Sequence, residues 1–195
     1  MATTAEALTK SQAARRQRVL VAALQLGADG GYDAVQMRDV AASAEVALGT
    51  IYRYFPSKDA LLAAAMVEWM EDLERRVTTR APQGQTTTER VYDVLRRAVA
   101  TMERQPKLAE AVITALTSDD REAGGASTAT TDVMQRVMLR AFPEGTDPTM
   151  EANIARVLGH VWFSCLVAWS NGVGDLTWVG DELETACHLL CDHLG

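Results

Sequence analysis

Residues 36–61 of the chain read QMRDVAASAEVALGTIYRYFPSKDAL and contain two short helical patterns separated by a tight turn. In the first pattern the apolar side chains recur at steps of three and four, as on one face of a helix: Met37, Val40, Ala41 and Ala44. In the second, Leu48, Ile51 and Phe55 are predicted to face inward, so that the two helices share one small core. Pro56 ends the second helix, because the residue before a proline is displaced from the helical conformation. The stretch therefore predicts a helix-turn-helix.

The second helix of this pair begins with small residues and continues with hydrogen-bonding groups, as a recognition helix that enters the major groove requires. Arg38, on the exposed side of the first helix, is expected to bind a guanine through both of its major-groove acceptors. Phosphate contacts are expected from Thr50, Tyr52, Tyr54 and Lys58. The full set of predicted DNA contacts is Gln36, Met37, Arg38, Ala47, Leu48, Gly49, Thr50, Tyr52, Arg53, Tyr54 and Lys58.

The end of this stretch resembles the signature of the TetR-type transcriptional repressors, Gly-Thr-x-Tyr-x-x-Phe-x-Ser/Asn-Lys-x-x-Leu. The matching residues are Gly49, Thr50, Tyr52, Phe55, Ser57, Lys58 and Leu61. The resemblance implies an all-α homodimer, with a DNA-binding helix-turn-helix domain of three helices over residues 1–57 and an effector-binding and dimerisation domain over residues 58–195. Two positions depart from the family pattern. Glu45 stands where glycine is common in the turn, which costs roughly 1 kcal/mol if its φ is positive, and Gln36 stands where Thr or Ser commonly opens the first helix.

Three further segments are similar to one branch of that family, the actinobacterial repressors of cholesterol catabolism: GGYDAVQMRDVA at 30–41, QPKLAEA at 105–111 and IARVLGHVWFSCLVAW at 154–169. In that branch the inducer is a steroid-derived coenzyme A thioester, so the resemblance implies a repressor released by an apolar effector. Residue types do not decide whether this chain keeps the same ligand. Two alternatives stay open: a TetR-type regulator of an efflux system that senses apolar compounds, and a helical interaction protein that does not bind operator DNA.

The composition excludes several other classes of protein. A net charge of −7 and a pI near 5.0 argue against a general nucleic-acid coat, although residues 1–60 carry +1 and the remainder −8. No apolar run reaches the ~20 residues of a membrane span, and the first residues contain no apolar signal segment. A cytoplasmic protein that does not enter a membrane is therefore expected.

The start of the chain, to about residue 11, is small and polar and is expected to be a disordered arm. A helix is predicted from near Ser11 to Gly30-Gly31. The basic side chains Arg15, Arg16 and Arg18 are interpreted as a solvated face, with a phosphate or minor-groove contact as the alternative.

Further helical patterns follow to the end of the chain, at about 57–80, 88–102, 108–116, 133–142, 154–170 and 178–194. Residues 118–128, SDDREAGGAST, are predicted to be a flexible link. The last two helices are strongly apolar with no third layer after them, which favours a homodimer. They could instead only complete the core of one subunit.

Large adaptable side chains on the middle and late helices suggest a cavity for an apolar effector, although such residues are more often ordinary core. The predicted lining is Met66, Trp69, Met70, Met102, Leu108, Val112, Met134, Met138, Trp162, Leu166 and Trp169. The helix at 57–80 carries Lys58 near the reading helices and Trp69 roughly 16 Å further along its axis. A ligand that tilts this helix is expected to change the spacing of two recognition helices and release the DNA.

No catalytic motif is present: there is no Ser-His-Asp setting, no glycine-rich phosphate loop and no HExxH. Cys187 and Cys191 lie four residues apart on one helical pattern and could share a metal, but burial of reduced thiols is preferred, as for Cys165. No enzyme activity, cofactor or metal is predicted.

Overall fold

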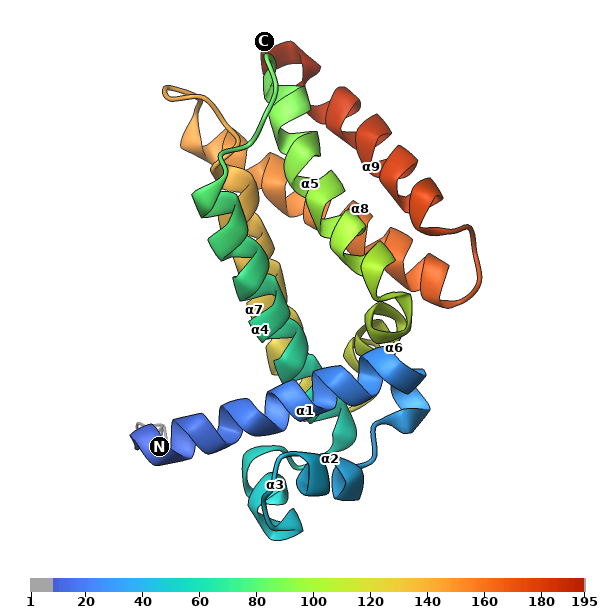
Figure 1. Ribbon diagram of the computed structural model, residues 1–195. Helices are drawn as coiled ribbons and strands as arrows, with labels where there is room; N and C mark the ends of the chain where they lie inside the picture. Colours follow the sequence, from blue (N-terminus) through green and yellow to red (C-terminus); the bar gives the residue numbers. More distant parts are fainter. Residues whose placement is uncertain (1–8, 195) are drawn as a thin grey trace.

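The computed structural model describes residues 9–194, and within them the chain is helical and contains no strand (Figure 1). The helices are α1 (Lys10–Ala34), α2 (Met37–Ser43), α3 (Leu48–Tyr54), α4 (Lys58–Thr79), α5 (Thr87–Arg104), α6 (Pro106–Leu116), α7 (Arg121–Leu139), α8 (Pro148–Ser170), α9 (Leu176–Cys191) and a final 3-10 turn, η1 (Asp192–Leu194). The predicted all-α class is confirmed.

Figure 1 shows α1 lying across one end of the molecule, with α2 and α3 beneath it and α4 leaving toward the opposite end. α4 packs along α7 and on α6 and α1, whereas α5 packs on α9, and α9 on α8. Within the described residues, α4 makes no extensive backbone approach to α5 or α8. Only side chains therefore fill the space between α4 on one side and α5 and α8 on the other.

The first helix begins near Ser11, as predicted, and ends in a kink. Thr9 and Gln12 form a reciprocal capping box, which satisfies backbone donors at the start of α1. The expected disordered arm falls mostly on residues 1–8, which lie outside the described part of the chain. Gly31, at φ 74° and ψ −164°, interrupts the helix at the predicted end, but a last helical turn continues to Ala34.

The predicted flexible link is wrong, because α7 already begins at Arg121 and runs through the glycine-rich segment. Intrinsic propensity disfavours a helix there, since each glycine costs about 1 kcal/mol relative to alanine. The rest of α7 packs on α4 and α8. This tertiary packing outweighs the local preference.

Side chains cap the start of four other helices. Ser57 accepts the backbone N–H of Ala60 at the start of α4, as predicted from the sequence. Thr86 and Glu89 form a second capping box at α5. Two aspartates, Asp147 and Asp175, cap α8 and α9. The ends of these helices are therefore set by local sequence.

One continuous apolar core runs from α1 to α9. Where α1 crosses α6, Gly27 allows a close approach: a Cβ at this position would lie 2.9 Å from Leu108 Cδ1. Because α1 packs on α6 as well as on α4, the core crosses the predicted boundary at residue 57. The division into domains at 57 stays a prediction.

Candidate DNA-binding surface and effector cavities

The turn between α2 and α3 has the geometry of a Schellman motif. Val46 N–H donates to Ala41 O at 3.0 Å, and Glu45 N–H donates to Ala42 O at 3.2 Å. Glu45 adopts φ 54°. A residue other than glycine thus occupies a left-handed position, as the departure from the family pattern suggested, at a cost of roughly 1 kcal/mol.

The two helices of this motif divide their side chains between a core face and a free face. Ile51 and Phe55 are buried, as predicted. The predicted inward orientation of Leu48 is wrong, because its side chain is 39% exposed. Leu48 is the first residue of α3 and lies one turn before Tyr52, which is 49% exposed, so the two share the outer face.

Most of the predicted DNA contacts lie on this free face. The exposed ones are Gln36, Arg38, Ala47, Leu48, Gly49, Tyr52 and Arg53. The half-buried ones are Met37, Thr50, Tyr54 and Lys58. A Cβ added to Gly49 would meet no atom within 4 Å, so the protein itself does not require glycine at this position.

Two of the three arginines of α1 hold the reading helices in place. Arg18 Nε donates to Ala44 O at 3.3 Å, at the end of α2. The Arg16 guanidinium lies 5.3 Å from the centre of the Phe55 ring and 3.6 Å from a carboxylate oxygen of Glu68 on α4. A solvated face is therefore the wrong interpretation for half-buried Arg16, whereas Arg18 makes this one bond and stays exposed, as a solvated face requires. They brace α1 against α2, α3 and α4.

Lys58 is also engaged within the protein. Its ammonium lies 3.6 Å from the centre of the Tyr32 ring and donates to Tyr32 O at 3.2 Å. The Tyr32 hydroxyl in turn donates to Asp59. Burial, together with this bond to a carboxylate, raises the pKa of Tyr32 to about 12. These contacts fix the start of α4 against the end of α1.

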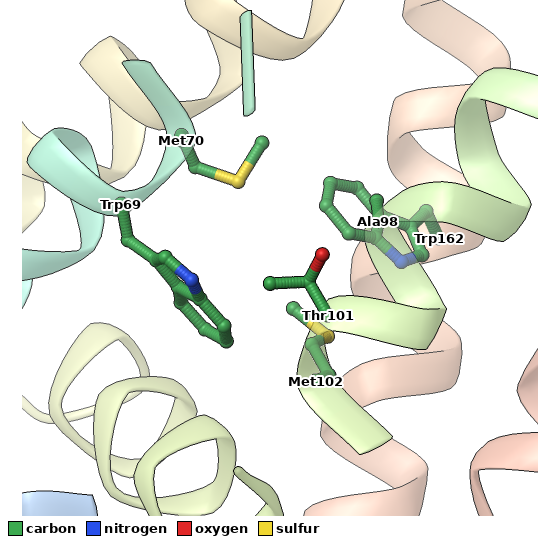
Figure 2. A pocket seen from close by; sticks show the side chains of 6 residues that line it. All are labelled: Trp69, Met70, Ala98, Thr101, Met102 and Trp162. Atoms are coloured by element: carbon green, nitrogen blue, oxygen red, sulfur yellow. The ribbon is translucent and has the colours of Figure 1, made fainter. Parts of the chain in front are cut away.

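A first cavity lies between α4, α5 and α8. Figure 2 shows Trp69 and Met70 of α4 facing Thr101 and Met102 of α5 and Trp162 of α8 across it. Ala98 completes the lining. The cavity volume is about 10 Å³, which is room for one water molecule.

A second cavity, of about 30 Å³, shares Trp162 with the first as a lining residue. Its other lining residues are Met66, Ile113, Leu116, Thr130, Thr131, Met134, Gly159, Phe163 and Leu166. The indole Nε1 of Trp162 is buried and has no hydrogen-bond partner among the described residues.

The structure brings together seven of the predicted cavity residues: Met66, Trp69, Met70, Met102, Met134, Trp162 and Leu166. Four others line neither cavity: Leu108, Val112, Met138 and Trp169. Leu108 packs against α1 at Gly27, and Val112 and Met138 are fully buried core.

Sequence reasoning missed the smaller and more polar lining residues, including Ala98, Thr101 and Thr130. A helical-spacing signal was available for two of them: Ala98 lies one turn before Met102, and Thr130 lies one turn before Met134. A pocket for a drug-sized ligand measures roughly 300–1,000 Å³. Both cavities must therefore widen to admit an apolar effector of that size.

The cysteines have the environment of core thiols. Cys165, Cys187 and Cys191 are free and buried, as preferred from the sequence. Burial raises the pKa of Cys187 to about 12 and that of Cys191 to about 11, which disfavours the thiolates that a metal would need. Within residues 9–194, no three His, Cys, Asp or Glu side chains are grouped as metal ligands.

No helix in the described part of the chain combines the length and the apolar character needed to cross a bilayer.

Two segments of the chain match family profiles of known proteins. Residues 19–65 match the profile described as bacterial regulatory proteins, tetR family, and residues 84–190 match that of the tetracyclin repressor-like C-terminal domain. A curated relative, the HTH-type transcriptional repressor KstR of Rhodococcus jostii (strain RHA1), is 39% identical over 93% of this chain and 85% of its own length.

Solved structures share the fold over most of the chain. A TetR transcriptional regulator from Rhodococcus sp. RHA1 superposes with a TM-score of 0.83 at 30% identity, covering 95% of this chain and all of that one. FadR of Thermus thermophilus, a TetR-family repressor solved in complex with lauroyl-CoA, has a TM-score of 0.69 at 23% identity and covers 90% of this chain and 92% of its own.

Proposed function

The chain belongs to the TetR family of bacterial transcriptional repressors, and from this premise we propose that it binds palindromic operator DNA as a homodimer and releases it when an apolar acyl thioester enters the cavities between α4, α5 and α8. Members of this family are regulators, and the protein is not an enzyme. A repressor acts where the DNA is, so the proposal places it in the cytoplasm.

The free face of α2 and α3 carries the DNA-binding part of this proposal. Arg38 is exposed and can reach a base edge, and Gly49 leaves the start of α3 without a side chain where the backbone must approach the groove. Arg16, Arg18 and Lys58 are used inside the protein instead. The proposed division is that α2 and α3 read bases while α1 and α4 hold them rigidly.

Exposed apolar side chains on the last two helices support a homodimer. Phe163 on α8 is 38% exposed and Leu189 on α9 is 79% exposed. Two copies related by a two-fold axis would present two reading helices to the two halves of a palindrome, one helical turn apart.

The position of α4 supports the effector part. α4 starts at the reading helices and carries Trp69 and Met70 on the wall of the first cavity, while α5 and α8 form the opposite wall. A ligand that widens this cavity must separate α4 from α5 and α8. Because α4 is also fixed to α1 through Lys58 and Tyr32, the reading helices are expected to move with it.

Two features favour an acyl thioester over other apolar effectors. A TetR-family neighbour of the same fold is solved with lauroyl-CoA, and three segments of this chain resemble a branch whose inducer is a steroid-derived coenzyme A thioester. The lining consists largely of adaptable methionine and tryptophan side chains, which suits a long apolar group.

The test is DNA retention with the promoter fragment of the protein's own gene, before and after addition of lauroyl-CoA or a coenzyme A thioester of a steroid acid. We expect sequence-specific retention by a dimer and release by at least one of the two thioesters. Equal retention of an unrelated fragment would refute operator binding. Retention that neither thioester changes would refute the proposed effector class and favour an efflux-type inducer.

A further inference from the structure

A basic groove lies between the end of α4 and the second half of α5. It has a volume of about 350 Å³ and is lined by five arginines, Arg76, Arg80, Arg96, Arg97 and Arg104, together with Ala100 and Thr101. Five guanidinium groups around one hollow repel one another, and the chain as a whole carries a net charge of −7. Such a cluster therefore needs a counter-charge.

Acidic side chains of the protein supply only part of that counter-charge. Asp93 pairs with Arg96 at 3.0 Å and also with Arg97, and Asp72 pairs with Arg76. By contrast, the guanidinium groups of Arg80 and Arg104 have no hydrogen-bond or ion-pair partner among the described residues. Both residues are exposed. The guanidinium groups of Arg80 and Arg104 are thus available to bind an anion in the basic groove.

Arg97 links the two walls of this basic groove. Arg97 donates to the carbonyl oxygens of Arg80 at 2.7 Å and Ala81 at 3.2 Å, where the chain leaves α4. Burial by itself would raise the pKa of Asp93, but the Gln83 amide and the Arg97 and Arg96 guanidiniums hold that pKa below its usual value. Arg97 and Asp93 therefore fix the end of α4 to α5 and leave Arg80 and Arg104 free to bind.

The basic groove adjoins the first effector cavity, because Thr101 lines both. In Figure 2 the Thr101 side chain points into the space between Trp69 and Trp162. On α5, Thr101 lies one turn after Arg97 and one turn before Arg104. On α4, Arg76 and Arg80 follow Trp69 by roughly 10 and 16 Å along the helix axis. The apolar cavity and the basic groove are thus adjacent and meet at Thr101.

We propose that the basic groove binds the phosphate-bearing head of the effector, with Arg80 and Arg104 as its direct contacts, while the acyl part occupies the cavity beside Trp69 and Trp162. The inference rests on the proposed function and adds to it the recognition of the nucleotide head. Guanidinium groups bind phosphate oxygens through paired, charge-assisted hydrogen bonds. Operator DNA is not the occupant, since the groove lies at the opposite end of α4 from α2 and α3 (Figure 1).

The experiment is a calorimetric titration of the full-length protein with three probes: coenzyme A alone, lauroyl-CoA and lauric acid. The test variant is Arg80→Gln with Arg104→Gln. The matched control is Arg75→Gln with Arg156→Gln, which removes the same charge from exposed arginines outside the basic groove. Thermal melts check that both variants fold, and binding is measured again with added salt.

We expect the wild type to bind coenzyme A at low salt and to bind lauroyl-CoA about tenfold or more tightly than lauric acid, since charge-assisted hydrogen bonds are worth that much in affinity. In the test variant coenzyme A binding should be lost and the tenfold preference should fall to about twofold or less. The control should retain both. Added salt should weaken the wild type toward the test variant.

The inference is overturned if coenzyme A binds equally to the wild type and the test variant, or does not bind the wild type at all. A failure of this inference can be distinguished from a failure of the proposed function by measuring the release of operator DNA. If lauric acid and lauroyl-CoA release operator DNA equally well, the apolar effector site stands and the basic groove is not its head-binding part. If neither releases DNA, the effector class fails, and coenzyme A alone still decides whether the basic groove binds a polyanion.

Discussion

Around α2 and α3, charged and aromatic side chains hold the helices through hydrogen bonds and cation–π contacts. Around the cavities between α4, α5 and α8, by contrast, methionine and tryptophan side chains make most of the contacts. At the reading end, Arg18 binds Ala44 O, Arg16 lies over Phe55, and Lys58 binds Tyr32 O. At the effector end, Trp162 lines both small cavities and its indole N–H has no partner among the described residues.

This difference separates rigidity from adaptability in one chain. A hydrogen bond or cation–π contact has one good geometry, so the reading helices are expected to move as a unit. Methionine and tryptophan contacts can be rearranged with little loss, so the cavities can widen. Changes at the reading end should therefore alter DNA affinity and leave effector binding intact, and changes at the effector end should do the reverse.

The largest effect is expected from Gly49→Leu. A Cβ at this position meets no protein atom, so the variant should fold, but the added side chain lies where α3 must approach the DNA. We predict that operator affinity falls about a hundredfold or more and that Gly49→Ala is affected much less. The measurement is a gel-shift titration beside a thermal melt. Wild-type operator affinity in Gly49→Leu would show that α3 does not enter the groove by this end.

Arg38→Ala tests base reading by the same face. Loss of a bidentate contact to guanine should cost about 1–3 kcal/mol on the operator and nothing on an operator in which that guanine is replaced. Binding of lauroyl-CoA should be unchanged. If the variant keeps the wild-type preference between the two operators, Arg38 does not read a base.

Trp69→Ala tests the effector end. Because Trp69 is only half-buried, the loss of stability should fall below the ~3–5 kcal/mol of a fully buried tryptophan. Operator affinity should stay within about twofold, while the thioester concentration needed for release rises about tenfold. Trp178→Ala is the control, since Trp178 is also half-buried but lines neither cavity. A Trp69→Ala protein that still responds fully would remove this residue from the coupling.

Asp93→Asn tests the ion pair within α5 that orients Arg97 toward the end of α4. The folded pKa of Asp93 lies below its unfolded value, so its stabilisation is complete above the unfolded pKa of about 4 and is lost as the pH falls through the folded pKa. The variant should be less stable than the wild type by about 1 kcal/mol near pH 7. This difference should shrink as the pH falls below about 4 and through the folded pKa, and exposed Asp119→Asn should show no difference over the same range. A constant difference across this range would exclude the charge of Asp93 as the cause.

The smallest effect is expected from Tyr52→Phe, which removes one hydroxyl from the exposed face of α3. A phosphate contact predicts a loss of about 1 kcal/mol or less, equal on operator and random DNA. Filter binding at two salt concentrations measures both. A loss confined to the operator would make Tyr52 a base-reading residue.

The helix-turn-helix was predictable because its information is local. The spacing of Val40, Ala41 and Ala44 sets one helix, and Pro56 with Ser57 sets the end of the other and the start of α4. The departure at Glu45 from the expected glycine also corresponded to a positive φ. These features depend on residues within a few positions of one another, so no distant contact is needed to read them.

The cavities and the basic groove were less accessible, because they depend on how helices face one another. Periodicity identified Met66, Trp69 and Trp162 as apolar stripes, but it could not distinguish them from Val112 and Met138, which have the same pattern and lie in solid core. The rotation of each helix about its axis decides this difference.

The sequence by itself determined the helical class, the reading motif and the family resemblance, since all three depend on short-range spacing and on particular residues in a fixed order. Only the tertiary structure decided that Leu48 faces outward, that α7 continues through a glycine-rich segment, and that Arg80 of α4 and Arg104 of α5 border one hollow. The two arginines are distant in sequence. They border the same groove because the packing of the hydrophobic core sets the positions of α4 and α5 relative to each other. The local sequence determines which side chains lie on each face of a helix, but the packing of the whole chain determines which of these side chains come together.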